Sequence, residues 1–123
     1  MTTTGTRILQ GRTLDGFARK MERAEGVNIH ALPPFTTLLV ETRNSVYRIV
    51  LLQRSRILVQ GGQFFPHLVE AHLVGSSFGG SAVKMAWIGV GLRLEINGDG
   101  GRTITSQILN VRIQVPAEGG RSH

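Results

Sequence analysis

The stretch TRNSVYRIVLLQRSRILVQGG, Thr42 to Gly62, carries the clearest pattern in the chain. Apolar side chains alternate with Arg and Gln on both sides of a short basic turn, and this period of two is typical of half-buried β-strands. Asn44-Ser45 favours a tight turn before a strand over residues 46–52. Residues 53–56 favour a second turn, which leads into a strand over residues 57–60. The stretch therefore predicts an antiparallel hairpin with Tyr47 in the core and its arginines facing water.

The same alternation extends in both directions from this hairpin. It predicts further strands over residues 37–43, 68–74, 87–96 and 103–115, and the Gly/Ser run 75–81 predicts a flexible loop. About six strands joined by short turns predict a mainly β fold, a small antiparallel barrel or sandwich. The expected inward faces of the last two strands are Ile88, Val90, Leu92, Leu94 and Ile96, and Leu109, Val111, Ile113 and Val115. The expected outward faces carry charges of mixed sign, which include Glu95.

One helix is expected before the strands. In residues 13–25, TLDGFARKMERAE, the apolar side chains Leu14, Phe17, Ala18 and Met21 form a stripe on one face. A chain of 123 residues fits one domain. The predicted organisation is a flexible N-terminus (1–12), a single barrel-like domain that includes the helix (13–115), and a disordered tail (116–123).

The chain is basic, with a net charge of +6, which raises the expectation of a polyanionic partner. The charge is spread evenly: residues 1–26 hold five basic and three acidic groups, residues 27–74 four and two, and residues 75–123 five and three. Mixed charges on outward strand faces are ordinary sheet chemistry. A nucleic-acid-binding surface is therefore an alternative hypothesis, and it uses Arg43, Arg48, Arg54 and Arg56.

The composition and the first residues also indicate the cellular compartment in which the protein is expected. The chain contains no Cys, which excludes disulfides, thiolate metal sites and cysteine nucleophiles. Residues 1–7 lack the apolar segment of a signal peptide, and no apolar run approaches the roughly 20 residues that a membrane helix needs. We expect a cytoplasmic bacterial protein without a membrane partner.

The sequence predicts no catalytic, cofactor or metal site. His67 or His72 with Glu70 and a serine from the Gly/Ser run is the one arrangement resembling a catalytic triad, but the GxSxG motif is absent. The two histidines point to opposite strand faces, which leaves too few ligands for a metal. The Gly/Ser run lacks the Lys-Ser/Thr and helix of a phosphate-binding loop. A small-molecule site in the mouth of the barrel remains a further alternative.

Self-association is the leading functional hypothesis. Phe64 and Phe65 are adjacent, so they cannot both point inward from an extended segment. Gly89 and Gly91 leave a notch on the expected outward face, which invites close approach by a ring or a backbone. With the helix stripe, these positions predict a non-enzymatic binding or assembly module that forms a homo-oligomer. The expected interface residues are Phe17, Met21, Phe64, Phe65, Gly89 and Gly91.

Several motifs also resemble a pattern of small β-rich bacterial proteins with no assigned activity. The resemblance covers roughly residues 38–113 and implies a β-rich fold without adding a catalytic residue. It lies in Thr42-Arg43-Asn44-Ser45-Val46-Tyr47-Arg48-Ile49, Gly61-Gly62 before Phe64-Phe65, Trp87-Ile88-Gly89-Val90-Gly91 and Thr105-Ser106-Gln107-Ile108.

Overall fold

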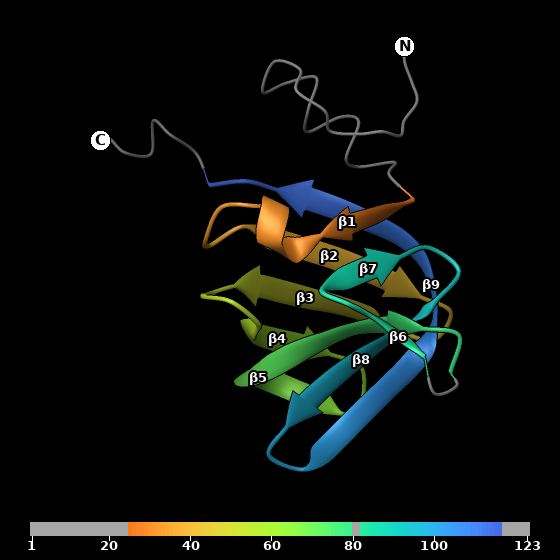
Figure 1. Ribbon diagram of the computed structural model, residues 1–123. Coiled ribbons are helices and arrows are strands. Elements are labelled where there is room, and N and C mark those ends of the chain that lie inside the picture. The colour runs from red at the N-terminus through yellow and green to blue at the C-terminus, as the bar shows by residue number, and fades with distance from the viewer. Residues whose placement is uncertain (1–24, 80–81, 117–123) are drawn as a thin grey trace.

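The computed structural model describes residues 25–79 and 82–116, and this part of the chain is mainly β (Figure 1). It holds nine strands in two antiparallel sheets, against about six predicted. Their bounds are β1 (Gly26–Asn28), β2 (Thr37–Thr42), β3 (Val46–Leu51), β4 (Arg56–Gly61), β5 (Phe65–Ser77), β6 (Val83–Met85), β7 (Trp87–Gly89), β8 (Arg93–Gly98) and β9 (Gly101–Gln114). One 3-10 turn, Ile29–Ala31, follows β1. Apart from Glu25, the predicted helix 13–25 lies outside the described residues, as does the predicted N-terminal segment 1–12.

The larger sheet has seven strands in the order β4-β3-β2-β9-β8-β5-β6. Because β4 also pairs with β5, the sheet is ring-like, although it is not a barrel. Strands β1 and β7 form a separate two-stranded sheet (Figure 1). The prediction of a mainly β, antiparallel fold is thus confirmed in its coarse form.

The hairpin predicted from residues 42–62 is present. Strand β3 pairs antiparallel with β2 on one side and with β4 on the other. Tyr47, Ile49 and Leu51 of β3 are buried, as the alternation predicts. They join a core of 18 buried apolar side chains, which includes Leu38, Val40, Ile57, Val59, Leu94, Ile96, Ile108 and Val111.

The prediction of one continuous strand over residues 87–96 is wrong. The segment divides into β7 and β8, which belong to different sheets. Between them Gly91 has a φ of 93°, and the amide of Leu92 donates to the Gly89 carbonyl at 3.1 Å, so the chain turns there. Val90, expected inward, is exposed because it lies in this turn.

One further predicted face and the predicted loop also need correction. The pairing of β9 with β2 shifts: Glu41 pairs with Asn110, but Thr42 pairs with Ile108. Leu109 is the extra residue of this bulge, and a bulge of this kind changes which side chains of the strand face the core. Ile108 is therefore buried and Leu109 is exposed, while Val115 is half-buried. In β5 the strand continues to Ser77, so the first part of the predicted loop 75–81 is β-structure that pairs with both β6 and β8.

Candidate functional site

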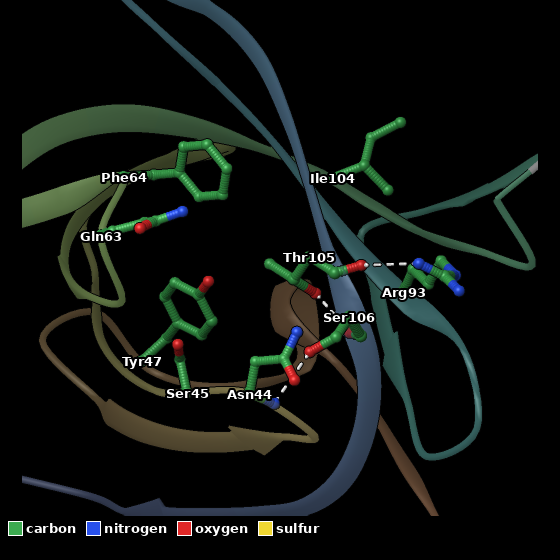
Figure 2. A pocket seen from close by; sticks show the side chains of 9 residues that line it. All are labelled: Asn44, Ser45, Tyr47, Gln63, Phe64, Arg93, Ile104, Thr105 and Ser106. Atoms are coloured by element: carbon green, nitrogen blue, oxygen red, sulfur yellow. Dashed lines mark hydrogen bonds between the residues drawn. The ribbon is translucent and has the colours of Figure 1, made fainter.

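A hollow lies where the β2–β3 and β4–β5 turns meet β9 (Figure 2). Its volume is about 500 Å³. Seven of its nine lining side chains carry hydrogen-bonding groups, and the other two are Phe64 and Ile104. The full lining is Asn44, Ser45, Tyr47, Gln63, Phe64, Arg93, Ile104, Thr105 and Ser106. Below, we call it the polar pocket.

Hydrogen bonds fix the β2–β3 turn against β9. The Thr42 hydroxyl donates to the Ser45 carbonyl at 3.1 Å, which closes the turn. The amide of Asn44 donates to the Ser106 hydroxyl at 3.1 Å, and the amide of Arg43 donates to the Gln107 carbonyl at 3.0 Å. The backbone of Asn44 is therefore held in place, and its side chain lines the pocket.

Tyr47 forms the floor of the pocket on the side of β3. Its ring is in the core and lies edge-on to Phe65, with ring centroids 6.5 Å apart. Burial raises the pKa of its hydroxyl, and a hydrogen bond from Ser45 lowers it in part. A Cβ at Gly62 would lie 2.8 Å from the Tyr47 hydroxyl oxygen, so a glycine in the β4–β5 turn is what leaves room for that hydroxyl.

Phe64 stands between the polar pocket and a second hollow of about 300 Å³. The second hollow is lined by Phe64, Phe65, Val69, Glu70, Thr103 and the turn residues 98–101. Phe64 is 57% exposed, so its ring can contact a bound molecule. Phe65 is in the core. The expectation that only one of these two rings points inward is confirmed.

The wall formed by β9 and β8 supplies Thr105 and Arg93. The buried Thr105 hydroxyl accepts from the amide of Leu94 at 3.0 Å and donates to the Ser106 carbonyl at 2.7 Å. The guanidinium of Arg93 donates to the Thr105 carbonyl at 3.5 Å (Figure 2). Arg93 is the only charged residue among the nine that line the pocket, and the lining contains no acidic residue.

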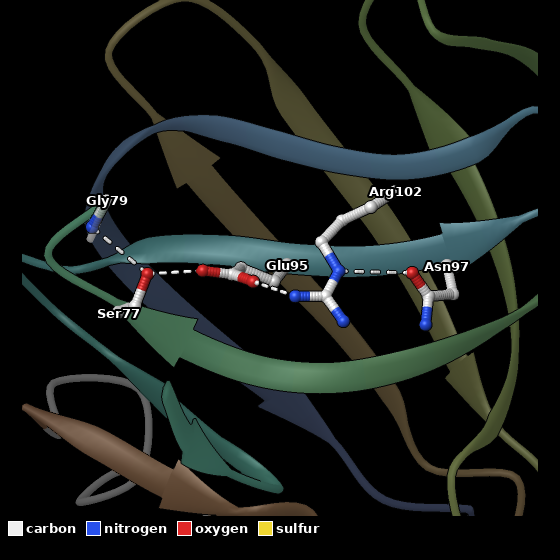
Figure 3. A network of polar contacts seen from close by, with 5 residues as sticks. All are labelled: Ser77, Gly79, Glu95, Asn97 and Arg102. Atoms are coloured by element: carbon white, nitrogen blue, oxygen red, sulfur yellow. Dashed lines mark hydrogen bonds and ion pairs between the residues drawn. The ribbon is translucent and has the colours of Figure 1, made fainter. Parts of the chain in front are cut away.

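A second polar cluster lies beside β8, where Glu95 was expected to face water. Instead Glu95 is 1% exposed, because the Ser77 hydroxyl and the Arg102 guanidinium cover its carboxylate (Figure 3). Arg102 Nη1 lies 3.1 Å from Glu95 Oε1, and Arg102 Nε donates to Asn97 Oδ1 at 3.3 Å. The Ser77 hydroxyl also accepts from the amide of Gly79 at 3.0 Å. The cluster joins β5 to the β8–β9 hairpin, and both carboxylate oxygens of Glu95 have a partner within it.

The described serines of the Gly/Ser run do not form a catalytic triad with the histidines, and Ser81, the third serine of that run, lies outside the described residues. Ser76 donates to the Trp87 carbonyl at 2.6 Å and Ser77 to Glu95, so neither serine is directed at a histidine. His72 Nδ1 instead lies 3.0 Å from the Ser55 hydroxyl. Within the described ranges no group of three or more His, Asp or Glu side chains could hold a metal ion.

The four arginines of the nucleic-acid hypothesis are spread over the sheet. Arg43 follows β2 in the β2–β3 turn, whereas Arg54 lies in the β3–β4 turn at the opposite end of these strands. Arg48 is exposed on β3. Arg56 is paired with Glu70, with 2.7 Å between Nε and Oε2. This arrangement gives no continuous basic surface, so the hypothesis gains no support from it.

The residues predicted for an oligomer interface are also spread. Phe17 and Met21 lie outside the described residues. The space at Gly89 is filled by the chain's own Trp87, whose Nε1 would lie 2.5 Å from a Cβ there. Gly91 has open space around it. Phe64 and Gly91 are thus the accessible members of this set among the residues described.

Sequence reasoning missed most of the polar pocket. The sequence indicates a turn at Asn44-Ser45 and a motif that includes Thr105-Ser106, but it predicts a site at neither. Gln63 and Arg93 gave no signal of their own. The pocket depends on residues up to 62 positions apart, and only strand pairing brings these together.

No protein-family model, no curated protein and no solved structure matches the chain. Within the described residues, no helix is long and apolar enough to cross a membrane.

Proposed function

We propose that this protein is a non-enzymatic binding module that holds a small molecule in the polar pocket. The observation that supports this is a 500 Å³ hollow lined by seven hydrogen-bonding side chains and one exposed aromatic ring. Pockets for small ligands commonly have volumes of 300–1,000 Å³ and use a few convergent polar groups to orient the ligand. Because the amides of Arg43 and Asn44 hold the β2–β3 turn to the Gln107 carbonyl and the Ser106 hydroxyl of β9, we expect the pocket to be largely formed before a ligand arrives.

The test is ligand-observed and protein-observed NMR with a library of small polar fragments. We expect a subset of fragments to shift the amide signals of residues 44–47, 63–64 and 104–106. Phe64→Ala removes an exposed wall of the pocket and should weaken the best fragment about tenfold, a typical effect for an aromatic contact residue.

Phe78→Ala is the matched control, because Phe78 is 85% exposed and does not line the pocket. Shifts confined to other parts of the sheet would contradict the proposal. An equal loss of affinity in the Phe64 and Phe78 variants would do the same.

Self-association is a second proposal, supported by a different observation. Large apolar side chains are exposed on three neighbouring strands: Leu39 on β2, Val46 on β3 and Leu109 on β9. Phe64 is exposed as well. Exposed large apolar side chains on neighbouring strands are typical of contact sites between proteins, although Arg48 and Arg112 flank Leu39 here. We propose that a second copy of the chain covers these side chains.

A further inference from the structure

The charges around the polar pocket distinguish it from its neighbour. Arg93 is the only charged residue lining the polar pocket, whereas the second hollow is lined by Glu70 and Asp99. Phe64 borders both hollows and separates them. Glu70 is paired with Arg56, which leaves Asp99 as the acidic side chain of the second hollow without an ion pair among the described residues. A negatively charged group is therefore favoured on the Arg93 side of Phe64, where no acidic residue is in the lining.

The uncharged part of the lining has a second property. The side-chain amides of Asn44 and Gln63 each offer both a donor and an acceptor, as do the hydroxyls of Ser45, Tyr47 and Ser106. Among residues 25–79 and 82–116, neither of these two side-chain amides has a hydrogen-bond partner within the protein. Ligand hydroxyl groups, which also donate and accept, are the natural complement to such a set.

From these two properties we propose that the pocket binds a small organic anion that carries hydroxyl groups. The proposal rests on the proposed function, since it names the ligand class of the same pocket. The anionic group pairs with the Arg93 guanidinium, whose planar fork suits both carboxylate and phosphate oxygens. The hydroxyl groups face Asn44 and Gln63, and the apolar side of the ligand lies against the ring of Phe64.

The pocket volume sets the size of this anion. A hollow of about 500 Å³ accommodates a single sugar-sized ring with its substituents. Carboxylate and phosphate share the chemistry that Arg93 recognises, so a sugar acid and a sugar phosphate are the two sources to separate.

The test is calorimetric titration of the full chain, in buffer with enough salt to suppress nonspecific ion binding. The probes are glucuronate, glucose 6-phosphate, neutral glucose, and acetate as an anion without hydroxyl groups. We expect at least one of the first two to bind about tenfold or more tightly than both glucose and acetate. Which of the two binds identifies the carboxylate or the phosphate as the group held.

Arg93→Gln should abolish this preference and bring the affinity of the anionic sugar to that of glucose. Arg93→Lys keeps the charge without the planar fork and should retain part of the preference, which separates charge from geometry. Arg48→Gln removes the same charge from an exposed position outside the pocket and should leave binding unchanged. The amide spectrum of each variant establishes that it is folded.

Three results would overturn the proposal. They are binding of glucose as tight as that of the anionic sugars, an unchanged preference in Arg93→Gln, and an equal loss in Arg48→Gln. If the anions fail while neutral fragments still shift residues 44–47 and 104–106, the ligand class is wrong but the pocket function stands. If no probe or fragment shifts these signals, both proposals fail.

Discussion

Glu95 is the residue at which burial and charge conflict most directly. Its carboxylate is buried between β5 and β9. Contacts with the Ser77 hydroxyl and the Arg102 guanidinium compensate for the loss of its hydration. Arg102 is itself half-exposed, so its charge remains partly hydrated and the pair does not suffer the full penalty of a completely buried ion pair. The carboxylate therefore depends on its partners more than Arg102 does.

Arg102→Ala should consequently destabilise the fold. It leaves the buried Glu95 carboxylate with Ser77 alone, and we expect the free energy of unfolding to fall by about 1–3 kcal/mol. Urea denaturation measures this change. Arg112→Ala removes an exposed arginine from the same strand and should change stability by less than about 0.5 kcal/mol. Equal unfolding midpoints for the two variants would show that Arg102 does not stabilise Glu95.

The exposed pair of Arg56 and Glu70 gives a prediction about pH. The hydrogen bond and charge of Arg56 lower the pKa of Glu70 from 4.5, and the nearby His72 adds a smaller effect in the same direction. Because the folded-state pKa is the lower one, the pair's contribution to stability is present above the unfolded-state pKa and is lost as the pH falls through the folded value. The two side chains are 45% and 51% exposed, so water screens the pair and this contribution is small.

Arg56→Gln should raise the pKa of Glu70 towards 4.5, as followed by NMR titration of its side-chain carboxyl. Arg48→Gln lies on the neighbouring strand and makes no ion pair among the described residues, so it serves as the control. A Glu70 pKa that stays low in the Arg56 variant would assign the shift to another cause.

Among the elements, strands β2, β3 and β4 were predictable because each has one face in the core and one in water. Leu38, Val40 and Thr42 are buried while Leu39 and Glu41 are exposed, which is the alternation that the sequence shows. The prediction failed where the same alternation continued through a turn, between β7 and β8, because the pattern of side chains does not reveal a backbone reversal at Gly91. It failed again in β9, because a bulge shifts the register with no signal in composition.

The small sheet of β1 and β7 depends on close packing around one indole. Trp87, the only tryptophan in the chain, lies against Gly26 and Gly89, with the Lys84 ammonium 4.2 Å from its ring centroid. A Cβ at Gly26 would lie 2.0 Å from the Trp87 ring, and at Gly89 2.5 Å from its nitrogen. The two glycines therefore permit β1 to pair with β7.

Gly26→Ala should push the indole away from β1 and towards water. Since no other tryptophan contributes, we expect the fluorescence emission maximum to move to longer wavelength, and stability to fall by about 1–3 kcal/mol, as for overpacking. Gly100→Ala is the control, because open space surrounds Gly100 in the β8–β9 turn. An unchanged emission spectrum in the Gly26 variant would show that β1 can repack without displacing the ring.

At the scale of the whole molecule, the ring-like sheet covers its core but leaves apolar side chains on its outer surface. We expect self-association to bury these side chains, so the mass in solution should exceed the 13.4 kDa of one chain. Light scattering coupled to gel filtration measures this mass. Val46→Glu places a charge on the exposed surface of β3 and should shift the population towards the monomer.

Arg54→Gln, at an exposed position in the β3–β4 turn at the other end of β3 from Val46, should leave the assembly largely unchanged. A wild-type mass of one chain at micromolar concentration would refute self-association. The pocket proposal does not depend on this outcome, since all nine lining residues come from one chain.

The sequence by itself determined that the chain is mainly β and antiparallel, and it determined the hairpin of residues 42–62 with Tyr47 in the core. This information is local, because alternation and turn residues act over a few neighbouring positions. Only the tertiary structure decided that the sheet is ring-like, that Glu95 is buried, and that Asn44, Gln63, Arg93 and Ser106 line one pocket. These features arise from pairing between strands that are distant in the chain, and the alternation of side chains within a single strand does not specify its partners.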